Sequence, residues 1–238
     1  MTTTVDAFLG GRLQILQPAD GYRAGMDAVM LAAACPLTSG QTVMDLGCGV
    51  GTAGLCLAAR TYALVTGVEL LTEQVDLAVQ NATANDLSMT IVQGDATARP
   101  TPVCDQSFDH VITNPPYFRY GHGKLAADAT RATGRSGDVD LGLWIGTAHK
   151  RLNPKGWLTL IQRIDRLPHV LAACGGFGDM QVLPITARTG RPPDRFILRA
   201  KKSARGAFKM LPAMVMHEGA SHEKDGESFT QVVRDVLR

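Results

Sequence analysis

The feature that most constrains the fold is an alternation, beginning at Gln41, of short apolar segments with segments of helical periodicity. Such alternation is typical of βαβ units, in which helices pack against a parallel sheet. We therefore expect an α/β fold. The expected strands are 42–46, 63–68, 89–92, 108–113, 157–161, 180–185 and 195–200. The expected helices between them are 52–60, 72–82 with Thr72 as its cap, 141–152, and 167–174 with Asp165 as its cap.

Two further parts flank this core. Residues 5–16 predict a small hairpin, because apolar residues alternate on both sides of Gly10-Gly11, a two-residue turn signal. An alanine-rich helix over 26–35 follows and ends at Pro36. We divide the chain into 1–40, a hairpin and helix packed on the core; 41–202, the core; and 203–238, a C-terminal extension of the same domain. The sequence pattern does not indicate a role for the apolar run 210–216 in that extension.

Composition narrows the function classes without choosing one. The chain has 238 residues, 45% of them hydrophobic, and a net charge of +2 that neither demands nor excludes a nucleic acid. Five cysteines without C-x-x-C spacing indicate reduced thiols and argue against a zinc site. The N-terminus lacks a secretory signal, and no apolar run is long enough for a bilayer. We expect a cytoplasmic monomer without membrane contact.

The expected strand 108–113 ends in a rigid turn, Asn114-Pro115-Pro116-Tyr117. Each proline fixes its own φ and restricts the residue before it, so the side-chain carbonyl of Asn114 and the backbone carbonyl of Pro115 point in set directions. Two acceptors of this kind match the two donors of a planar –NH₂ group and turn its lone pair towards an electrophile. The Tyr117 ring offers a face for the group that carries the nitrogen. An ordinary strand-ending turn is the alternative.

A glycine loop follows the first expected core strand. It reads Asp45-Leu-Gly47-Cys48-Gly49-Val-Gly51 and precedes a helix, a context in which backbone N–H groups face a bound ligand. The dinucleotide fingerprint is not met, because its third glycine would fall at Thr52. Asp45 would repel a pyrophosphate but would attract the ammonium of an amino-acid moiety. The loop therefore suits S-adenosylmethionine, although glycines after a strand are also found in plain turns.

Acidic residues end the next two expected strands. Glu69 stands where a carboxylate binds both hydroxyls of a ribose, and Asp95 is placed to accept from an adenine amino group. Their neighbours Leu70 and Ala96, and Asn114 after the fourth strand, are also expected to contact the cofactor. A solvated strand end and a turn cap are the structural alternatives for the two acids. Ligands of open α/β sheets bind at the carboxyl ends of strands, so four such signals together favour a site.

These residues carry a family resemblance. Asp45-x-Gly47-x-Gly49-x-Gly51, Glu69, Asp95 and Asn114-Pro115-Pro116-Tyr117 stand in the order of one enzyme group. The chain resembles, over about residues 41–200, the class I S-adenosylmethionine-dependent methyltransferases of the Asn-Pro-Pro-Tyr amino-methylating group. The resemblance implies a Rossmann-like sheet of seven strands in the order 3-2-1-4-5-7-6, with the last strand to be threaded antiparallel.

The segment before the core adds a narrower resemblance. Gln17-Pro-Ala-Asp-Gly-Tyr22-Arg23, followed by Met26-Asp-Ala-Val-Met-Leu31, is similar to bacterial tRNA adenine-N6 methyltransferases that modify the adenine beside the anticodon of a valine tRNA. This implies that Tyr22 and Arg23 close over the cofactor. The tail after Ser203 matches that group only loosely.

The expected reaction is transfer of the sulfonium methyl group to an exocyclic amine, with no metal and no general base. The expected catalytic residues are Asn114, Pro115, Pro116 and Tyr117. Adenine N6 in tRNA is the expected acceptor. Guanine N2 in rRNA, the amide of a protein glutamine, and non-catalytic binding of cofactor and RNA are the alternatives.

RNA contacts are expected from basic residues, which suit phosphates. The substrate-binding candidates are Phe118, Arg119, Arg131, Arg188 and Arg191. A wider basic cluster, Arg188 to Arg205, is expected at one end of the domain; solvated charges on an edge strand are the alternative.

Overall fold

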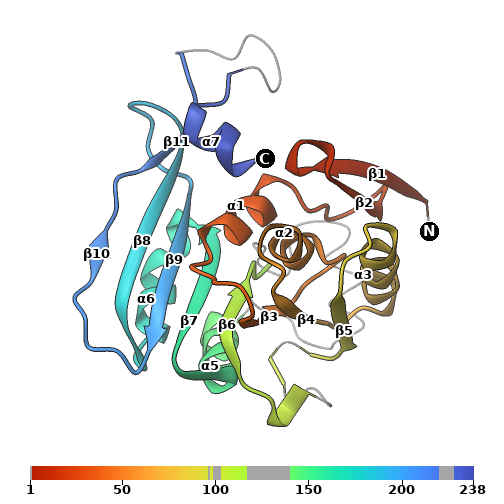
Figure 1. The fold of residues 1–238 in the computed structure, drawn as a ribbon. Helices are drawn as coiled ribbons and strands as arrows, with labels where there is room; N and C mark the ends of the chain where they lie inside the picture. The colour runs from red at the N-terminus through yellow and green to blue at the C-terminus, as the bar shows by residue number, and fades with distance from the viewer. Residues whose placement is uncertain (1, 96, 99–102, 117–139, 220–227) are drawn as a thin grey trace.

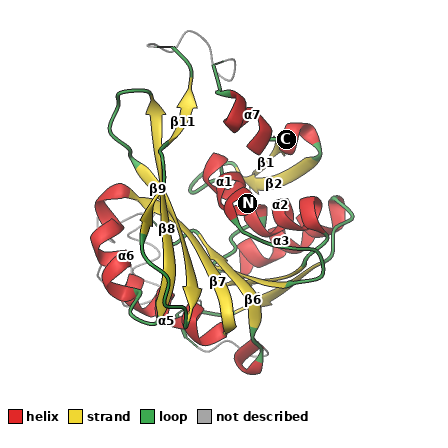
Figure 2. Ribbon diagram, turned by 60° about the vertical axis from the view of Figure 1, so that its left-hand side comes forward, coloured by secondary structure: helices red, strands yellow, loops and turns green. Residues whose placement is uncertain are grey.

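The computed structural model describes residues 2–95, 97–98, 103–116, 140–219 and 228–238. Within these residues the protein has a three-layer α/β architecture (Figures 1 and 2). One face of the central sheet is covered by α1 (Met26–Ala34), α2 (Thr52–Thr61) and α3 (Thr72–Ala84). The other face is covered by α5 (Leu141–Arg151) and α6 (Leu167–Ala173).

The order of the core strands confirms the predicted topology. Along the sheet the order is β5-β4-β3-β6-β7-β9-β8, which is 3-2-1-4-5-7-6 when the core strands are counted along the chain. The strand β9 runs antiparallel to both of its neighbours, also as expected. The core strands are β3 (Thr42–Leu46), β4 (Leu64–Glu69), β5 (Met89–Gln93), β6 (Phe108–Thr113), β7 (Leu152–Arg163), β8 (Phe177–Arg188) and β9 (Arg195–Lys202).

Alternate residues of the central strands enter two separate cores. Val43 and Ile112 pack with the α1–α3 layer, whereas Met44 and Val111 pack with the α5–α6 layer. Successive side chains of a strand point to opposite faces of its sheet, so strands covered on both faces are apolar throughout. This explains why these strands read as continuous apolar runs in the sequence.

The N-terminal hairpin forms, but its turn is longer than predicted. β1 (Thr3–Phe8) pairs antiparallel with β2 (Leu13–Pro18), and Phe8 faces Leu13. The connection therefore has four residues, 9–12, and includes a 3-10 turn at Leu9–Gly11. Leu9 is 2% exposed and leaves the strand with φ 51° to reach the core. The prediction of a two-residue turn was wrong, because burial of Leu9 requires a wider loop.

Asn81 of α3 and Asn85, which follows the helix, attach this hairpin to the core. Asn81 Oδ1 accepts from Leu16 N at 2.7 Å, and Asn81 Nδ2 donates to Leu16 O and Val50 O, both at 3.0 Å. One turn later, Asn85 bonds both backbone groups of Gln14. The α3 helix thus meets β2 as a partner strand would, and Asn81 also fixes Val50 of the glycine loop.

The C-terminal extension adds two strands to the predicted seven. β10 (Lys209–Met210) and β11 (Met214–His217) both pair parallel with β8, so the described sheet has nine strands. They are short and flank Pro212, so no alternating pattern identified them in the sequence. Helix α7 (Gln231–Val236) follows and lies near α1 and α2.

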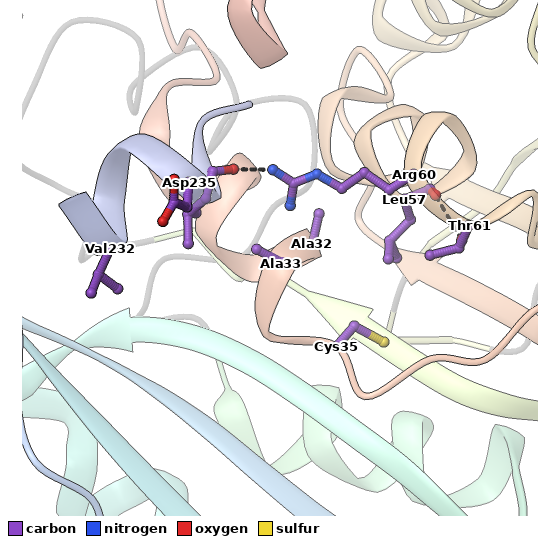
Figure 3. A pocket seen from close by; sticks show the side chains of 9 residues that line it. Ala32, Ala33, Cys35, Leu57, Arg60, Thr61, Val232 and Asp235 are labelled. Carbon is purple, nitrogen blue, oxygen red and sulfur yellow. Dashed lines mark hydrogen bonds between the residues drawn. The ribbon is translucent and has the colours of Figure 1, made fainter.

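A groove of about 420 Å³ lies between α1, α2 and α7 (Figure 3). Arg60 of α2 donates to the carbonyl oxygen of Val236 and so ties α7 to the core. Burial lowers the pKa of this guanidinium. Cys35 at the end of α1 also lines the groove.

Both predicted helix caps were wrong. The cap position of α3 is Leu71, and Thr72 instead accepts a hydrogen bond from Gln93 at 2.8 Å. A 3-10 turn, Ile164–Arg166, precedes α6, and Asp165 pairs with Arg163 rather than capping the helix.

Among the described residues, no helix is long and apolar enough to cross a membrane.

The asparagine attachment yields a stability prediction. We expect Asn81→Ala to lower the free energy of unfolding by about 3 kcal/mol, because three backbone groups near the core lose their partner. Asn85→Ala is the matched control, and its bonds to Gln14 are exposed, so it should cost less than about 1 kcal/mol. Urea unfolding followed by circular dichroism measures both. Equal losses for the two variants would contradict the role given to Asn81.

Candidate cofactor and catalytic site

Four parallel strands bring the predicted site residues to one edge of the sheet. Asp45 of β3 faces Gly67 of β4 and Ile112 of β6, so Glu69 and Asn114 both lie just beyond it in the strand direction. Asp95 follows β5, whose last residue, Gln93, pairs with Glu69. The carboxyl ends of β3, β4, β5 and β6 therefore place the four residues along one rim.

The glycine loop after β3 has backbone angles that favour glycine. Gly47, Gly49 and Gly51 have φ of +76°, +56° and +86°. A Cβ on Gly47 would also lie 2.5 Å from the Trp144 ring, so this position needs glycine for space as well as for conformation. A Cβ on Gly49 would meet only Gln74 Oε1, at 3.9 Å, which leaves that side of the loop open to a ligand. Cys48, between them, is buried and donates its N–H to Val68 O.

Asp45 is a buried carboxylate at the base of this loop. It is 2% exposed, and its Oδ2 accepts from Gly54 N of α2 at 3.0 Å. Burial raises the pKa of Asp45 to about 7; the Gly54 hydrogen bond lowers it, and the charge of Glu69 raises it. A carboxylate held in this way is stabilised in its charged form by a cationic ligand.

Glu69 faces the same loop from β4. Its Oε2 accepts from Gly49 N at 2.9 Å, and its Oε1 accepts from Leu70 N at 2.8 Å and from Leu71 N at 3.0 Å. Oε2, which accepts one bond, can accept a further one, so these contacts orient the carboxylate and leave this oxygen able to receive a hydroxyl donor. The ribose role of Glu69 and the cofactor contact of Leu70 stay predictions.

Asp95 forms a local turn at the end of β5. Its Oδ1 accepts from both Thr97 N and Thr97 Oγ1 at 2.7 Å, an arrangement in which the side chain mimics a backbone turn. The structural alternative, a turn cap, therefore accounts for one of the two carboxylate oxygens of Asp95. The adenine role stays a prediction, and Ala96 lies outside the described residues.

The turn after β6 presents two polar groups that other elements hold. Asn114 Nδ2 donates to the Tyr22 hydroxyl at 3.2 Å. Pro115 is buried, and its carbonyl oxygen accepts from Gln162 Nε2 at 3.2 Å, whereas Pro116 is exposed. Tyr117, the fourth residue of the predicted catalytic turn, lies outside the described residues.

The segment before α1 is pinned by the hairpin. Gln17, 1% exposed, accepts from Ala24 N at 2.8 Å and donates to Ala24 O at 3.1 Å. Arg23 pairs with Asp6 of β1 at 2.5 Å, so its guanidinium braces this segment against the hairpin. Tyr22 turns towards Asn114 and lines the pocket described next.

A small pocket lies between this segment and the glycine loop. Thr52 lines it and has a buried hydroxyl oxygen without a hydrogen-bond partner in the structure. The acid, the open glycine face and this orphaned hydroxyl fit a ligand with an ammonium group. The lining residues are Gln17, Tyr22, Ala24, Ala28, Asp45, Gly47, Cys48, Gly49, Val50, Thr52, Ala53, Gln74 and Asn114. None of them lines the groove at α7.

The basic residues do not form the expected single cluster. In the register of β7 and β9, Arg195 lies opposite Arg163 at the end of the strands where the site residues lie. Lys201 lies opposite Trp157, near the other end of the same strands, because β9 runs from one end to the other. The buried Arg188 donates to the carbonyls of Glu218 and Gly219, so it holds the C-terminal extension and is not a surface phosphate contact as predicted.

Arg191 is exposed and its substrate role stays a prediction. Phe118, Arg119 and Arg131 lie outside the described residues. In the described parts of the chain, no three or more His, Cys, Asp or Glu residues are grouped as metal ligands.

Sequence reasoning missed two buried glutamines, Gln17 and Gln162. Both are polar residues at the ends of apolar strands, and both are 1% exposed. A polar side chain at the carboxyl end of the strand 157–161 was the available signal for Gln162. Its partner, the Pro115 carbonyl, is 47 residues away and is not visible in a pattern.

From the raised pKa of Asp45 we predict how cofactor binding depends on pH. Only the ionised carboxylate attracts the cofactor ammonium, so affinity for S-adenosylhomocysteine should rise about tenfold per pH unit below pH 6 and level off above the pKa of about 7. Because the pKa is raised, the folded free protein should also lose stability as pH rises from about 4 to about 7.

Isothermal titration calorimetry from pH 5 to 8 measures this affinity. Asp45→Asn should abolish the slope. Asp109→Asn should keep it, because Asp109 bonds Thr42 and Asn153 at the opposite end of the sheet. An affinity in the wild type that is independent of pH between 5 and 7 would contradict the assignment.

Known proteins match both the sequence and the fold. A curated relative from Tolumonas auensis, named tRNA1(Val) (adenine(37)-N6)-methyltransferase, is 27% identical over 199 residues, 81% of each chain. A protein of the same name from a Shewanella species (strain W3-18-1) is 34% identical over 62% of this chain and 63% of its own length.

Solved structures agree on the fold. A protein from Agrobacterium tumefaciens, described as a predicted O-methyltransferase, has a TM-score of 0.70 and 29% identity, covering 89% of this chain and 95% of its own. A 16S rRNA N2 methyltransferase from T. Thermophilus, solved with AdoMet and guanosine, has a TM-score of 0.61 and 21% identity, covering 84% of this chain and 50% of its own.

The family assignment comes from the core of the chain. Residues 25–184, which include the glycine loop and the Asn-Pro-Pro turn, match the family described as methyltransferase small domain. The chain therefore belongs to this family and is an S-adenosylmethionine-dependent methyltransferase.

Proposed function

We propose that the enzyme methylates an exocyclic amine of a nucleobase, and that the amine is adenine N6 in tRNA. The observation that carries this proposal is the position of two hydrogen-bond acceptors. Asn114 lines the small pocket beside the glycine loop, and the Pro115 carbonyl follows it in the chain. These acceptors suit the two hydrogens of an –NH₂ group.

The residues of the turn act by positioning. When bound, the cofactor supplies a methyl group activated by its sulfonium charge. Asn114 Oδ1 and Pro115 O each accept one amine hydrogen, which aims the nitrogen lone pair at the pocket. A new N–C bond replaces the C–S bond, and the extra proton leaves from the product nitrogen to water. Alignment of this kind removes much of the entropic barrier.

The pocket side of the site is proposed to hold the amino-acid and ribose parts of the cofactor. Asp45 would pair with the ammonium, and the carboxylate of Glu69, oriented by three backbone N–H groups, would accept from the ribose hydroxyls. The hydroxyl of Thr52, which has no partner in the structure, is a further contact for a polar group of the ligand.

The names of relatives support tRNA as the substrate. Two curated relatives are named for adenine methylation in tRNA1(Val), and the first spans 81% of this chain. The exposed Arg191 and Arg163, on the site edge of the sheet, are proposed to meet RNA phosphates. Guanine N2 in rRNA is less well supported, because the structure named for it is 21% identical and indicates the fold alone.

A label-transfer assay tests the acceptor. The protein is incubated with S-adenosylmethionine labelled in the methyl group and with separate tRNA, rRNA and protein fractions, and labelled tRNA is digested to nucleosides. We expect label in tRNA as N6-methyladenosine. Label in rRNA as N2-methylguanosine or in protein would replace the proposal, and no label in any fraction would favour the non-catalytic alternative.

The role of Asn114 gives a sharper prediction. Asn114→Ala should lower the single-turnover rate by about a hundredfold or more, because one of two aligned acceptors is lost. Its affinity for S-adenosylhomocysteine should change less than about threefold. Asn153→Ala is the control: this asparagine also precedes a proline but lies at the opposite edge, where it bonds Asp109. Wild-type rates in Asn114→Ala would refute the assignment.

A further inference from the structure

Asn114 and Pro115 are each bonded, through one polar group, to a side chain from another part of the chain. Tyr22, in the segment before α1, accepts from Asn114 Nδ2 at 3.2 Å. Gln162, at the end of β7, donates to Pro115 O at 3.2 Å. Neither residue belongs to the turn, and the two partners are 140 positions apart in the sequence.

The structure shows the Asn114 amide in one of its two orientations, with Nδ2 towards the Tyr22 hydroxyl. Rotation of that amide by half a turn exchanges a donor, Nδ2, for an acceptor, Oδ1. Only Oδ1 can accept a hydrogen from an amine. Because the Tyr22 hydroxyl accepts from Nδ2, the other end of the amide, Oδ1, is directed away from Tyr22 and remains able to accept.

Tyr22 is itself held by the hairpin. Gln17 bonds both backbone groups of Ala24, two residues after Tyr22, and donates to Asp6 at 2.6 Å. Arg23 pairs with the same Asp6 oxygen. This network fixes the two residues that follow Tyr22. The hairpin, which contributes Asp6 and Gln17, therefore gains a role in the geometry of the turn.

Gln162 acts on the second acceptor. Its amide has a fixed orientation, because Oε1 accepts from Arg163 N at 2.9 Å and Nε2 is left to donate to Pro115 O. The prolines alone leave the carbonyl of Pro115 about 40° of freedom in ψ. A carbonyl oxygen has two lone pairs, so the Gln162 bond fixes its direction and leaves one lone pair for a substrate hydrogen.

We propose that Tyr22 and Gln162 are positioning residues that hold Asn114 Oδ1 and Pro115 O in the geometry needed to grip the acceptor amine. The proposal rests on the proposed function, because it assumes that the turn receives an –NH₂ group. Neither side chain touches the amine; each acts through one residue of the turn.

Single-turnover methylation with saturating RNA and cofactor tests both residues. Tyr22→Phe and Gln162→Met should each lower the rate about tenfold or more, because small errors of alignment are costly. The KM for RNA and the affinity for S-adenosylhomocysteine should change less than about threefold. Tyr62→Phe, at the far end of α2, and Gln181→Met, on β8, are the matched controls and should keep the wild-type rate. Wild-type rates in both test variants would overturn the proposal, as would a loss confined to cofactor affinity.

A double-mutant cycle separates action through Asn114 from a direct effect. In the Asn114→Ala background, Tyr22→Phe should cause no further loss, since the amide that Tyr22 orients is absent. A full additional tenfold loss would contradict the proposed route.

Gln162→Glu is a second variant that keeps the size of the buried side chain. Its ionised form cannot donate to Pro115 O, whereas its protonated form can. Its rate relative to the wild type should therefore increase as pH falls. A relative rate that does not change with pH would contradict the role of the donor.

A structural measurement judges the proposal even if the wild type labels no acceptor. In neutron diffraction from crystals with S-adenosylhomocysteine, which distinguishes amide nitrogen from oxygen, Asn114 should have one amide orientation in the wild type and more than one in Tyr22→Phe. A single unchanged orientation in Tyr22→Phe would overturn the positioning role. Absence of label in every fraction, by contrast, would reject the proposed function alone.

Discussion

Parallel pairing of β3 with β4 and β6 is the constraint on which the rest of the site depends. Parallel strands end at the same edge, and each is followed by a connection that can carry a functional side chain. The register places Asp45, Glu69 and Asn114 along one rim although they span 70 positions of sequence. The glycine loop can bend over that rim because helix α2 begins directly behind it, at Thr52.

The cost of this arrangement is electrostatic. Asp45 has one described backbone donor, Gly54 N, and lies close enough to Glu69 for the two charges to interact. A buried carboxylate with so few partners reduces stability, and the α/β core must offset that cost. Retention of such a group is expected where a ligand completes its environment. Glu69, by contrast, has three backbone donors before any ligand arrives.

The support of the site extends well beyond the motif. Asn81 links α3, the hairpin and Val50, so the glycine loop and the hairpin that holds Tyr22 share one buried amide. Gln162 adds a contact from β7 to the Asn-Pro-Pro turn. Rigid elements thus hold both sides of the proposed reaction, which is the condition for catalysis by alignment.

Much of the fold followed from local patterns. The strands 42–46 and 108–113 have the predicted bounds because burial on both faces makes them continuous apolar runs with clear ends. The glycine loop and the Asn-Pro-Pro turn were visible for the same reason, since their chemistry is contiguous in sequence. The strand order came from a family resemblance and is confirmed.

Interactions between distant residues were not predictable in this way. Gln17 and Gln162 look like ordinary strand ends until the fold brings Ala24 and Pro115 to them. The basic residues of β9 look clustered in sequence, yet an eight-residue strand spans roughly 25 Å and separates them across the sheet. The charge of Arg188 led us to predict an RNA contact, but in the fold this side chain is buried against the carbonyls of Glu218 and Gly219.

The most direct test of the account is a crystal structure of the protein with S-adenosylhomocysteine and an oligonucleotide that carries the acceptor adenine. We predict that the adenine N6 lies about 3 Å from both Asn114 Oδ1 and Pro115 O, with the cofactor over the glycine loop. A bound adenine whose N6 meets neither oxygen, or a cofactor away from Asp45 and Glu69, would contradict it.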